Sequence, residues 1–255
     1  MWSDQPHPFG GIKERRTPSV NTLQIALQNW VAKLDKTFIQ SGHYKMILEG
    51  LGTTVKITMG ALVIGVIIGL VIALIKYLSE DSKALKPLAK LCDLYVTVIR
   101  GIPVTVLLLI FYYLIMVTCT NGVLVATITF GINSGAYMAE LIRSGINAVD
   151  KGQMEAGRSL GLSKMQTMRR IILPQAVRYV LPAVGNEFIA LLKETSVAGY
   201  VAVVDLTRAG NLVRNNTHDM FNPLMLVALT YLLMVVILTK ALGILERRLA
   251  KSDKR

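Results

Sequence analysis

One uncharged apolar run, from Ile57 to Ile75, constrains the fold of this chain more than any other feature. Its 19 residues would extend about 29 Å as an α-helix, which is enough to cross the hydrocarbon core of a bilayer. Lys56 stands at one end of the run, where its long side chain can reach the headgroup region. The run therefore predicts a transmembrane helix.

Further apolar segments predict more spans, and the composition agrees, because 53% hydrophobic residues is too apolar for an ordinary soluble domain. The fourth segment is interrupted by a proline and four polar residues, Pro182, Asn186, Glu187, Lys193 and Glu194. We expect an all-α, polytopic membrane protein with about five transmembrane helices. They cover about 50–76, 94–118, 123–142, 176–200 and 222–245.

The first 45 residues form an N-terminal extension before a membrane domain at 46–250. Residues 19–40 have helical periodicity, with apolar side chains spaced on one face: Leu23, Ala26, Leu27, Trp30, Val31 and Leu34. This pattern is typical of an interfacial amphipathic helix or of a simple surface helix, and the sequence leaves both open. The extension lacks the features of a signal peptide, so the first span is expected to act as an uncleaved signal.

Basic residues predict the direction of the chain through the membrane. The net charge of +12 would suggest nucleic acid in a soluble protein, but here the basic residues lie mostly between apolar segments. Segments 76–93, 143–178 and 240–255 hold 17 Lys or Arg, against nine in the N-terminal 45 residues, 118–122 and 193–222. The rule that cytoplasmic loops are basic places the N terminus outside and the C terminus in the cytoplasm. No nucleic-acid partner is expected.

The residues that would support catalysis or metal binding are scattered. The three His and the two cysteines, Cys92 and Cys119, form no metal-ligand spacing and no disulfide framework. Neither a phosphate-binding G-x4-G-K-[ST] loop nor an H-E-x-x-H motif occurs in the sequence. We therefore expect no catalytic site, no metal and no cofactor, and a membrane-embedded enzyme is the weaker alternative.

Residues 155–174, EAGRSLGLSKMQTMRRIILP, lie in a segment that the charge pattern places in the cytoplasm. Glu155 to Leu160 can form a short helix, and Gly161 suits a left-handed turn after it. Ser163 with Gln166 predicts a capping box at the start of a second helix. Pro174 lacks an N–H group, which suits the first turn of the following membrane helix.

Six of these residues, Glu155, Ala156, Gly161, Ile171, Leu173 and Pro174, stand at the spacing E-A-A-x3-G-x9-I-x-L-P. The segment resembles the EAA loop of ABC importer permeases, which implies a fold like that of the type I importers. Gly157 replaces the usual second Ala, and we expect it to loosen the first short helix. The resemblance implies that residues 150–174, which we call the coupling loop, dock on a separate ATP-binding subunit through these residues, Gly157 and Leu162. An ion channel or secondary transporter would not usually need such a loop.

Further motifs resemble the polar amino acid permeases, which include the histidine, glutamine and arginine systems. They include Arg100-Gly101-Ile102-Pro103, Gly152-Gln153 and 191–196, within a resemblance that runs from about Gly50 to Arg248. Leu107 departs from the pattern, because many members have Gln there. The implied partners are two copies of an ATP-binding subunit, a second permease subunit (identical or homologous), an extracytoplasmic amino-acid-binding protein and the lipid of a bacterial plasma membrane.

Charges inside the spans are costly, so each needs a partner or a function. Glu187 lies 13 residues past Pro174, about 20 Å along a helix, and its neighbour is Asn186. A carboxylate in a translocation path would attract a cationic side chain, whereas a salt bridge with a neighbouring helix is the alternative. Glu187, Asn186 and Glu140 are the candidate substrate-binding residues. They favour a basic amino acid, arginine first, over glutamine, glutamate or cystine.

Several charges have local explanations. Glu140 stands three residues before Arg143, a spacing at which helical neighbours pair. Glu194 adjoins Lys193, and Arg100 is expected to cap a helix or reach the headgroups. Asp205, Arg208, Arg214 and His218 lie between the last two spans, where they face a substrate-binding protein or only solvent. The small-residue pairs Gly65/Gly69 and Gly131/Gly135 allow close helix contact, within one subunit or between two.

Overall fold

The computed structural model describes residues 20–80 and 82–252, and this part of the chain is helical without any strand. It divides into two compact units at Tyr44 and Lys45. The first unit contains helix α1, Val20–Leu34, and the π-helix η1, Asp35–Gln40, in which Thr37 and Phe38 are buried. A helix is therefore present where the periodicity of residues 19–40 predicted one. Gly42 has φ +70°, and helix α2 begins directly after it.

Three helices are long and apolar enough to cross a membrane, counted over the described residues. They are α2, His43–Ser79, α5, Gly122–Asn147, and α10, Asn222–Ser252. These helices match the spans predicted at about 50–76, 123–142 and 222–245. A bent pair of helices raises the number to four if the pair is counted as one span.

This bent pair, Lys83–Gly101 and Val104–Ile115, contains most of the span predicted at about 94–118. The 3-10 turn η2, Lys83–Leu85, leads into α3, Lys86–Gly101, while α4, Val104–Ile110, continues into the π-helix η3, Phe111–Ile115. The two halves are bent by 107°. Pro103 causes the break, because it lacks an N–H group and favours an extended residue before it; Ile102 has φ −100° and ψ 130°.

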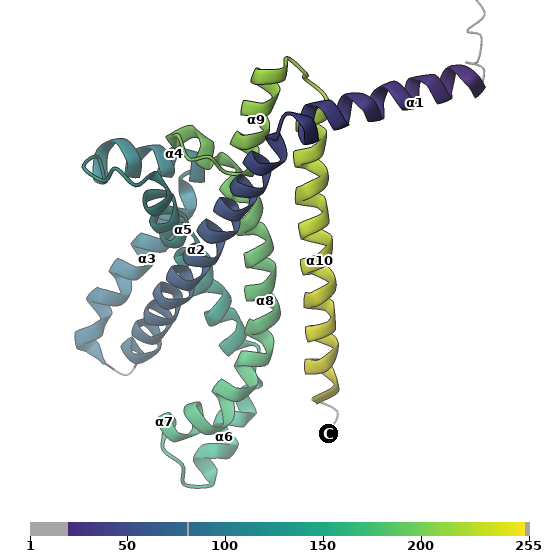
Figure 1. The fold of residues 1–255 in the computed structure, drawn as a ribbon. Coiled ribbons are helices and arrows are strands. Elements are labelled where there is room, and N and C mark those ends of the chain that lie inside the picture. Colours follow the sequence, from purple (N-terminus) through teal and green to yellow (C-terminus); the bar gives the residue numbers. More distant parts are fainter. Residues whose placement is uncertain (1–19, 81, 253–255) are drawn as a thin grey trace, which may run out of the picture. The chain divides into compact units, whose positions relative to one another are not determined.

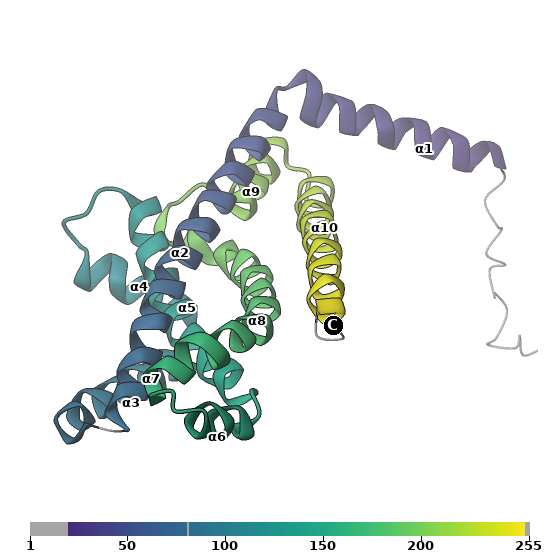
Figure 2. The same ribbon diagram turned by 90° about the horizontal axis from the view of Figure 1, so that it is seen from below.

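The segment predicted as a span at 176–200 forms α8, Leu173–Glu194, and the 3-10 helix η5, Thr195–Val201. Helix α8 is not among the helices apolar enough to count as a span, because its polar residues reduce its hydropathy. By length and composition, three helices, or four if the bent pair is one span, qualify as transmembrane among the described residues, beside the about five that the sequence predicted. Helix α8 packs along α5, and α10 lies beside α8 and α9, Leu206–Thr217 (Figures 1 and 2).

Helices α2 and α5 cross closely because glycines of each helix lie against side chains of the other. A Cβ atom on Gly65 would lie 2.8 Å from Ser134 Oγ, and one on Gly135 would lie 2.8 Å from Ile68 Cβ. A Cβ atom on Gly69 would lie 2.5 Å from Met138 Cβ. The small-residue pairs therefore serve packing within one chain. The adjoining core is fully buried around Phe130 of α5, where α2, α4, α8 and η5 meet.

Candidate functional site

The coupling loop lies at one end of the second unit, near the turn between α2 and α3 (Figures 1 and 2). It consists of α6, Lys151–Ser159, α7, Lys164–Thr167, and the π-helix η4, Met168–Ile172. Asp150 caps α6, since its Oδ1 accepts a hydrogen bond of 2.6 Å from the Gly152 N–H. Pro174 falls in the first turn of α8, as predicted.

The turn between α6 and α7 has the predicted geometry. Gly161 has φ +82°, the left-handed region in which only glycine is relaxed. Ser163 Oγ accepts from the Gln166 N–H at 3.2 Å, and Gln166 Oε1 accepts from the Ser163 N–H at 2.8 Å, which completes the capping box. Arg158 closes the turn by donating from Nη1 to the Leu162 carbonyl at 2.9 Å. The predicted turn and cap are therefore confirmed.

Gly157 has a different role from the one expected. It is buried, and a Cβ atom there would lie 2.8 Å from Thr167 Oγ1 and even closer to Thr167 Cγ2. Thr167 is itself fully buried and donates from Oγ1 to the Ser163 carbonyl at 3.0 Å. Gly157 therefore allows α6 to pack tightly against α7 and does not loosen the first helix.

The loop has one face anchored to the membrane helices and another that is exposed. Met168 and Ile172 are buried with Val149 and Ala176 in a small apolar cluster. On the exposed side lie Glu155, Ala156, Gly161 and Leu160, whose side chain is 80% exposed. Of the other candidate coupling residues, Leu162 and Ile171 are half-buried, whereas Leu173 and Pro174 are exposed.

The second helix of the loop also contacts the end of α2. Lys164 Nζ lies 3.6 Å from Glu80 Oε2 and 5.2 Å from the centre of the Tyr77 ring. Tyr77 in turn packs against the apolar cluster around Met168. The loop is thus held to the first span as well as to α5 and α8.

Two carboxylates of α8 accept hydrogen bonds from two adjacent polar residues of α5. Ser134 Oγ donates to Glu187 Oε1 at 3.0 Å, and Asn133 Nδ2 donates to Glu194 Oε2 at 3.3 Å. Both glutamates are half-buried. The ion pair expected between Glu194 and its neighbour Lys193 is replaced by this bond to α5, because α8 packs along α5 with both carboxylates in the contact. Glu187 has no basic partner within the described residues.

Asn186 lies beside Glu187 but is exposed. Its Nδ2 donates to the Pro182 carbonyl of its own helix at 3.2 Å.

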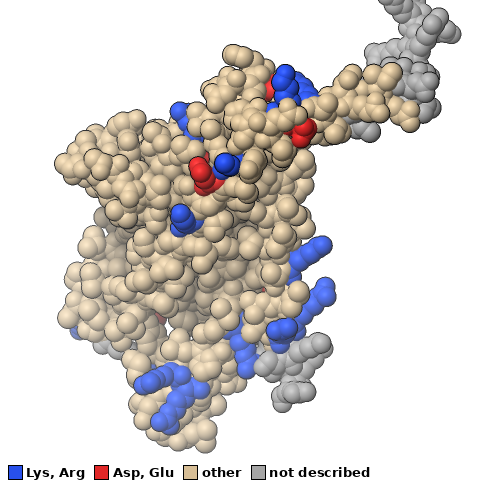
Figure 3. Space-filling view, viewed as in Figure 1, with Lys and Arg blue, Asp and Glu red and all other residues tan. Residues whose placement is uncertain are grey.

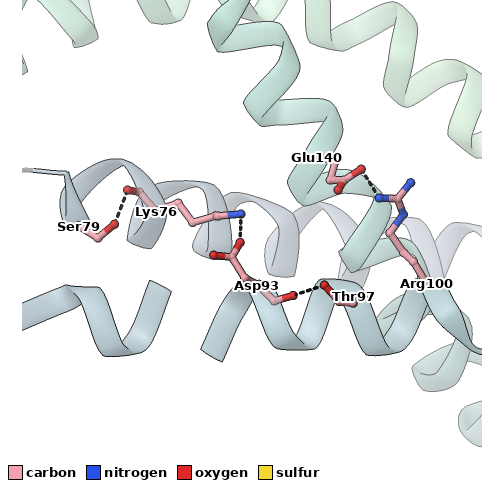
Figure 4. Close-up of polar contacts among 6 residues, drawn as sticks. All are labelled: Lys76, Ser79, Asp93, Thr97, Arg100 and Glu140. Carbon is pink, nitrogen blue, oxygen red and sulfur yellow. Dashed lines mark hydrogen bonds and ion pairs between the residues drawn. The ribbon is translucent and has the colours of Figure 1, made fainter. Parts of the chain in front are cut away.

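Glu140 forms an ion pair with Arg100 of α3 and not with Arg143 (Figure 4). The Arg100 guanidinium also lies 5.0 Å from the centre of the Tyr137 ring. The expected pairing of Glu140 with Arg143 is therefore wrong, because α3 lies against α5 and supplies a nearer cation. Arg100, which was expected to cap a helix or reach the headgroups, joins two helices. Glu140 and Glu187 therefore take part in separate contacts: Glu140 pairs with Arg100, and Glu187 accepts a hydrogen bond from Ser134.

Asp205 is also placed differently from the prediction, since it is fully buried and not available to an external partner. It caps α9, where its carboxylate accepts hydrogen bonds of 3.0 Å from the Thr207 and Arg208 N–H groups. Burial raises the pKa of Asp205 above its ordinary value, although these hydrogen bonds oppose the shift. Arg208 and His218 remain exposed.

Several residues of the site were not predicted from the sequence. Asn133, Ser134 and Thr167 carry no local signal, since their roles depend on which helices pack together. Leu160 did carry one, as an apolar residue directly before a left-handed glycine in a polar segment. Within the described residues, no group of His, Cys, Asp or Glu could hold a metal ion.

Comparison with known proteins decides the family. Residues 65–251 match the model described as "Binding-protein-dependent transport system inner membrane component". The chain belongs to this family. It is a transport subunit and not an enzyme.

Individual relatives agree with this assignment. The chain is 37% identical over 81% of its length to a putative glutamine transport system permease protein of Rickettsia bellii, of which 94% is covered. It is 35% identical over 81% of its length to an arginine transport system permease protein of Bacillus subtilis, of which 94% is covered. A solved amino acid ABC transporter with histidines has a TM-score of 0.75 and 39% identity, and the match covers 82% of this chain and 96% of that one.

Proposed function

We propose that this chain is a permease subunit of an ATP-driven importer for polar amino acids, and that its substrates are basic, with arginine first. It encloses the translocation path together with a second permease subunit, identical or homologous. Two copies of an ATP-binding subunit drive the transport, and an extracytoplasmic binding protein delivers the substrate. The N terminus lies outside and the C terminus lies in the cytoplasm. Relatives named for glutamine and for arginine support the amino acid class.

The choice of a basic substrate rests on the surroundings of the Glu187 carboxylate. Its carboxylate lies half-buried between α5 and α8 with one neutral donor, Ser134, at 3.0 Å. A carboxylate that lacks a basic partner in a low-dielectric site attracts a cationic side chain. Asn186 is the adjacent polar group. Glu140 is paired with Arg100, so it can contact substrate only in a state in which that ion pair is broken.

Glutamine is the second candidate substrate, and the names of several relatives favour it. Its amide would donate to Glu187 without a charge. The two candidates differ in one measurable respect, because only a cationic substrate depends on the charge of Glu187.

The coupling loop supports the ATP-driven mechanism. Its exposed side presents Leu160 and Glu155, while its other side is fixed by Met168 and Ile172. A partner that moves Leu160 would therefore move the end of α8 at Pro174, 13 residues before Glu187. Coupling of this kind requires a rigid element whose two positions both ligands bias.

Binding of the cognate ATP-binding subunit to purified protein tests the coupling role. We expect Gly161→Trp to abolish binding, because tryptophan at φ +82° is strained and its ring occupies the exposed side of the loop. Glu155→Lys should also weaken binding, since it reverses a charge on that side. Glu49→Lys, an equal change at an exposed position on α2, is the matched control. If both loop variants bind like the control, the coupling assignment is wrong.

A further inference from the structure

Arg143 is a basic residue that the proposed transport mechanism does not use. It is exposed near the end of α5, and its expected partner Glu140 is bound to Arg100. Arg143 makes no ion pair with any acid of the described residues. It lines a cleft of about 220 Å³ between the ends of α2, α3 and α5, together with Lys76, Asp93 and Asn147.

The acids of this cleft are already engaged. Asp93 forms an ion pair with Lys76, as Figure 4 shows. Glu80, the other acid of the lining, lies 3.6 Å from Lys164 Nζ. Because each acid has a cation of its own, Arg143 remains as an uncompensated charge in the cleft.

Helix α3 adds further positive charge beside the cleft. Lys86 and Lys90 are exposed, and each lies three residues before a lining residue, Ala89 and Asp93 respectively. Residues at this spacing are neighbours on a helix surface. The surroundings of the cleft therefore favour an anion.

Exposed apolar side chains flank the same cleft. Leu74 of α2 is 55% exposed, and Leu94 of α3 is 58% exposed. Leu74 directly follows the lining residue Ala73, and Leu94 directly follows Asp93, so both lie on the helix surfaces that adjoin the lining. Side chains of this kind on a membrane helix contact acyl chains, so the cleft lies where a lipid changes from acyl chain to headgroup.

We propose that this cleft binds the phosphate of an anionic membrane lipid, with Arg143 as its principal donor. The planar guanidinium can donate two parallel hydrogen bonds to phosphate oxygens, and the Asn147 amide can add a third. The flanking leucines select a lipid over free phosphate. Basic pockets between membrane helices on the cytoplasmic side are typical headgroup sites.

The choice of the leaflet that supplies the lipid rests on the proposed function of the coupling loop. Ile146 and Asn147 line both this cleft and a second cavity beneath α6, which also includes Glu155 of the coupling loop. If the loop docks on a cytoplasmic ATP-binding subunit, the lipid belongs to the cytoplasmic leaflet. The bound lipid would then join α2, α3 and α5 next to the segment that moves.

Lipid titration of the delipidated protein, followed by native mass spectrometry, tests the site. Phosphatidylglycerol should form one tight adduct per chain, and phosphatidylcholine and inorganic phosphate should bind much more weakly. Arg143→Gln should weaken the phosphatidylglycerol adduct about tenfold, as loss of a charged hydrogen bond implies. Arg143→Lys should retain part of the affinity, and Arg247→Gln, which removes an exposed charge on α10, should retain all of it.

Three outcomes would overturn the proposal: equal binding by Arg143→Gln and the unaltered protein, equal binding of the two lipids, or displacement of phosphatidylglycerol by inorganic phosphate. The last outcome would indicate a free-anion site. Melting temperatures of the variants show whether they fold. The same titration on the complex with the ATP-binding subunit separates the two proposals, because failed assembly refutes the coupling role and leaves the lipid result standing.

Discussion

At the scale of residues, one missing methyl group determines how the two short helices of the coupling loop pack. Gly157 faces Thr167, whose side chain is fully buried and cannot move without disturbing the bond to Ser163. Alanine would improve helix propensity by about 1 kcal/mol, but forcing an extra carbon into a packed contact costs about 1–3 kcal/mol. The packing effect is therefore expected to win.

We predict that Gly157→Ala lowers the stability of the loop by about 1 kcal/mol and weakens docking of the ATP-binding subunit. Thermal unfolding and a binding titration would measure the two effects. Thr167→Ser removes the methyl group nearest to the new carbon and keeps the hydroxyl, which lies 2.8 Å from that carbon, so the double variant should recover part of the loss. Gly243→Ala, with nothing within 4 Å of the new carbon, is the control. A neutral or stabilising Gly157→Ala would contradict this packing.

At the scale of elements, two ion pairs hold α3 to its neighbours (Figure 4). Asp93 pairs with Lys76 of α2, and Arg100 pairs with Glu140 of α5. Arg100 and Asp93 are seven residues apart, two turns of one helix. The side chains of Arg100 and Glu140 are 38% and 47% exposed, so solvent screens much of their attraction.

Reversal of the second pair tests its role in placing α3. Arg100→Glu or Glu140→Arg alone should lower the melting temperature, because each puts two like charges together. The double reversal should recover the stability that the single variants lose. We expect the recovered free energy of unfolding to be about 1 kcal/mol or less. A double variant no more stable than the weaker single variant would show that the pair does not hold α3 against α5.

Local sequence rules predicted those elements that depend on a few neighbouring residues. Gly161, the Ser163 cap and Pro174 stand where they were expected, since each follows from its own backbone chemistry. The bend at Ile102-Pro103 could also have been predicted from the proline. The partners of Glu140 and Glu194 could not, because they belong to helices far away in the sequence and depend on which faces pack together.

At the scale of the whole molecule, the distribution of charge supports one orientation in the membrane. Figure 3 shows Lys and Arg side chains over the end of the molecule that carries α6 and α7, whereas the upper part of the view shows Asp and Glu side chains beside its Lys and Arg side chains. Basic residues collect on the cytoplasmic side of a membrane protein. We therefore expect the opposite end, with residues 118–122, to face outward.

The native cysteines allow a direct test of this orientation. Cys119 is partly exposed between η3 and α5, whereas Cys92 is buried in α3. In intact cells, a membrane-impermeant maleimide should label Cys119, and Cys119→Ser should abolish labelling. Lys83→Cys in the Cys119→Ser background should react only after permeabilisation, since Lys83 is exposed at the opposite end. Labelling with the reverse pattern would show that the chain is inverted.

Uptake by vesicles that contain the complete transporter tests the central claim most directly. With ATP inside and the binding protein outside, we expect ATP-dependent uptake of arginine in preference to glutamine. Glu187→Gln should reduce arginine uptake at least about tenfold and leave glutamine uptake nearly unchanged, because only arginine uses the negative charge. Glu49→Gln is the control for loss of a remote exposed charge. Equal effects of Glu187→Gln on both amino acids, or uptake without ATP, would contradict the account.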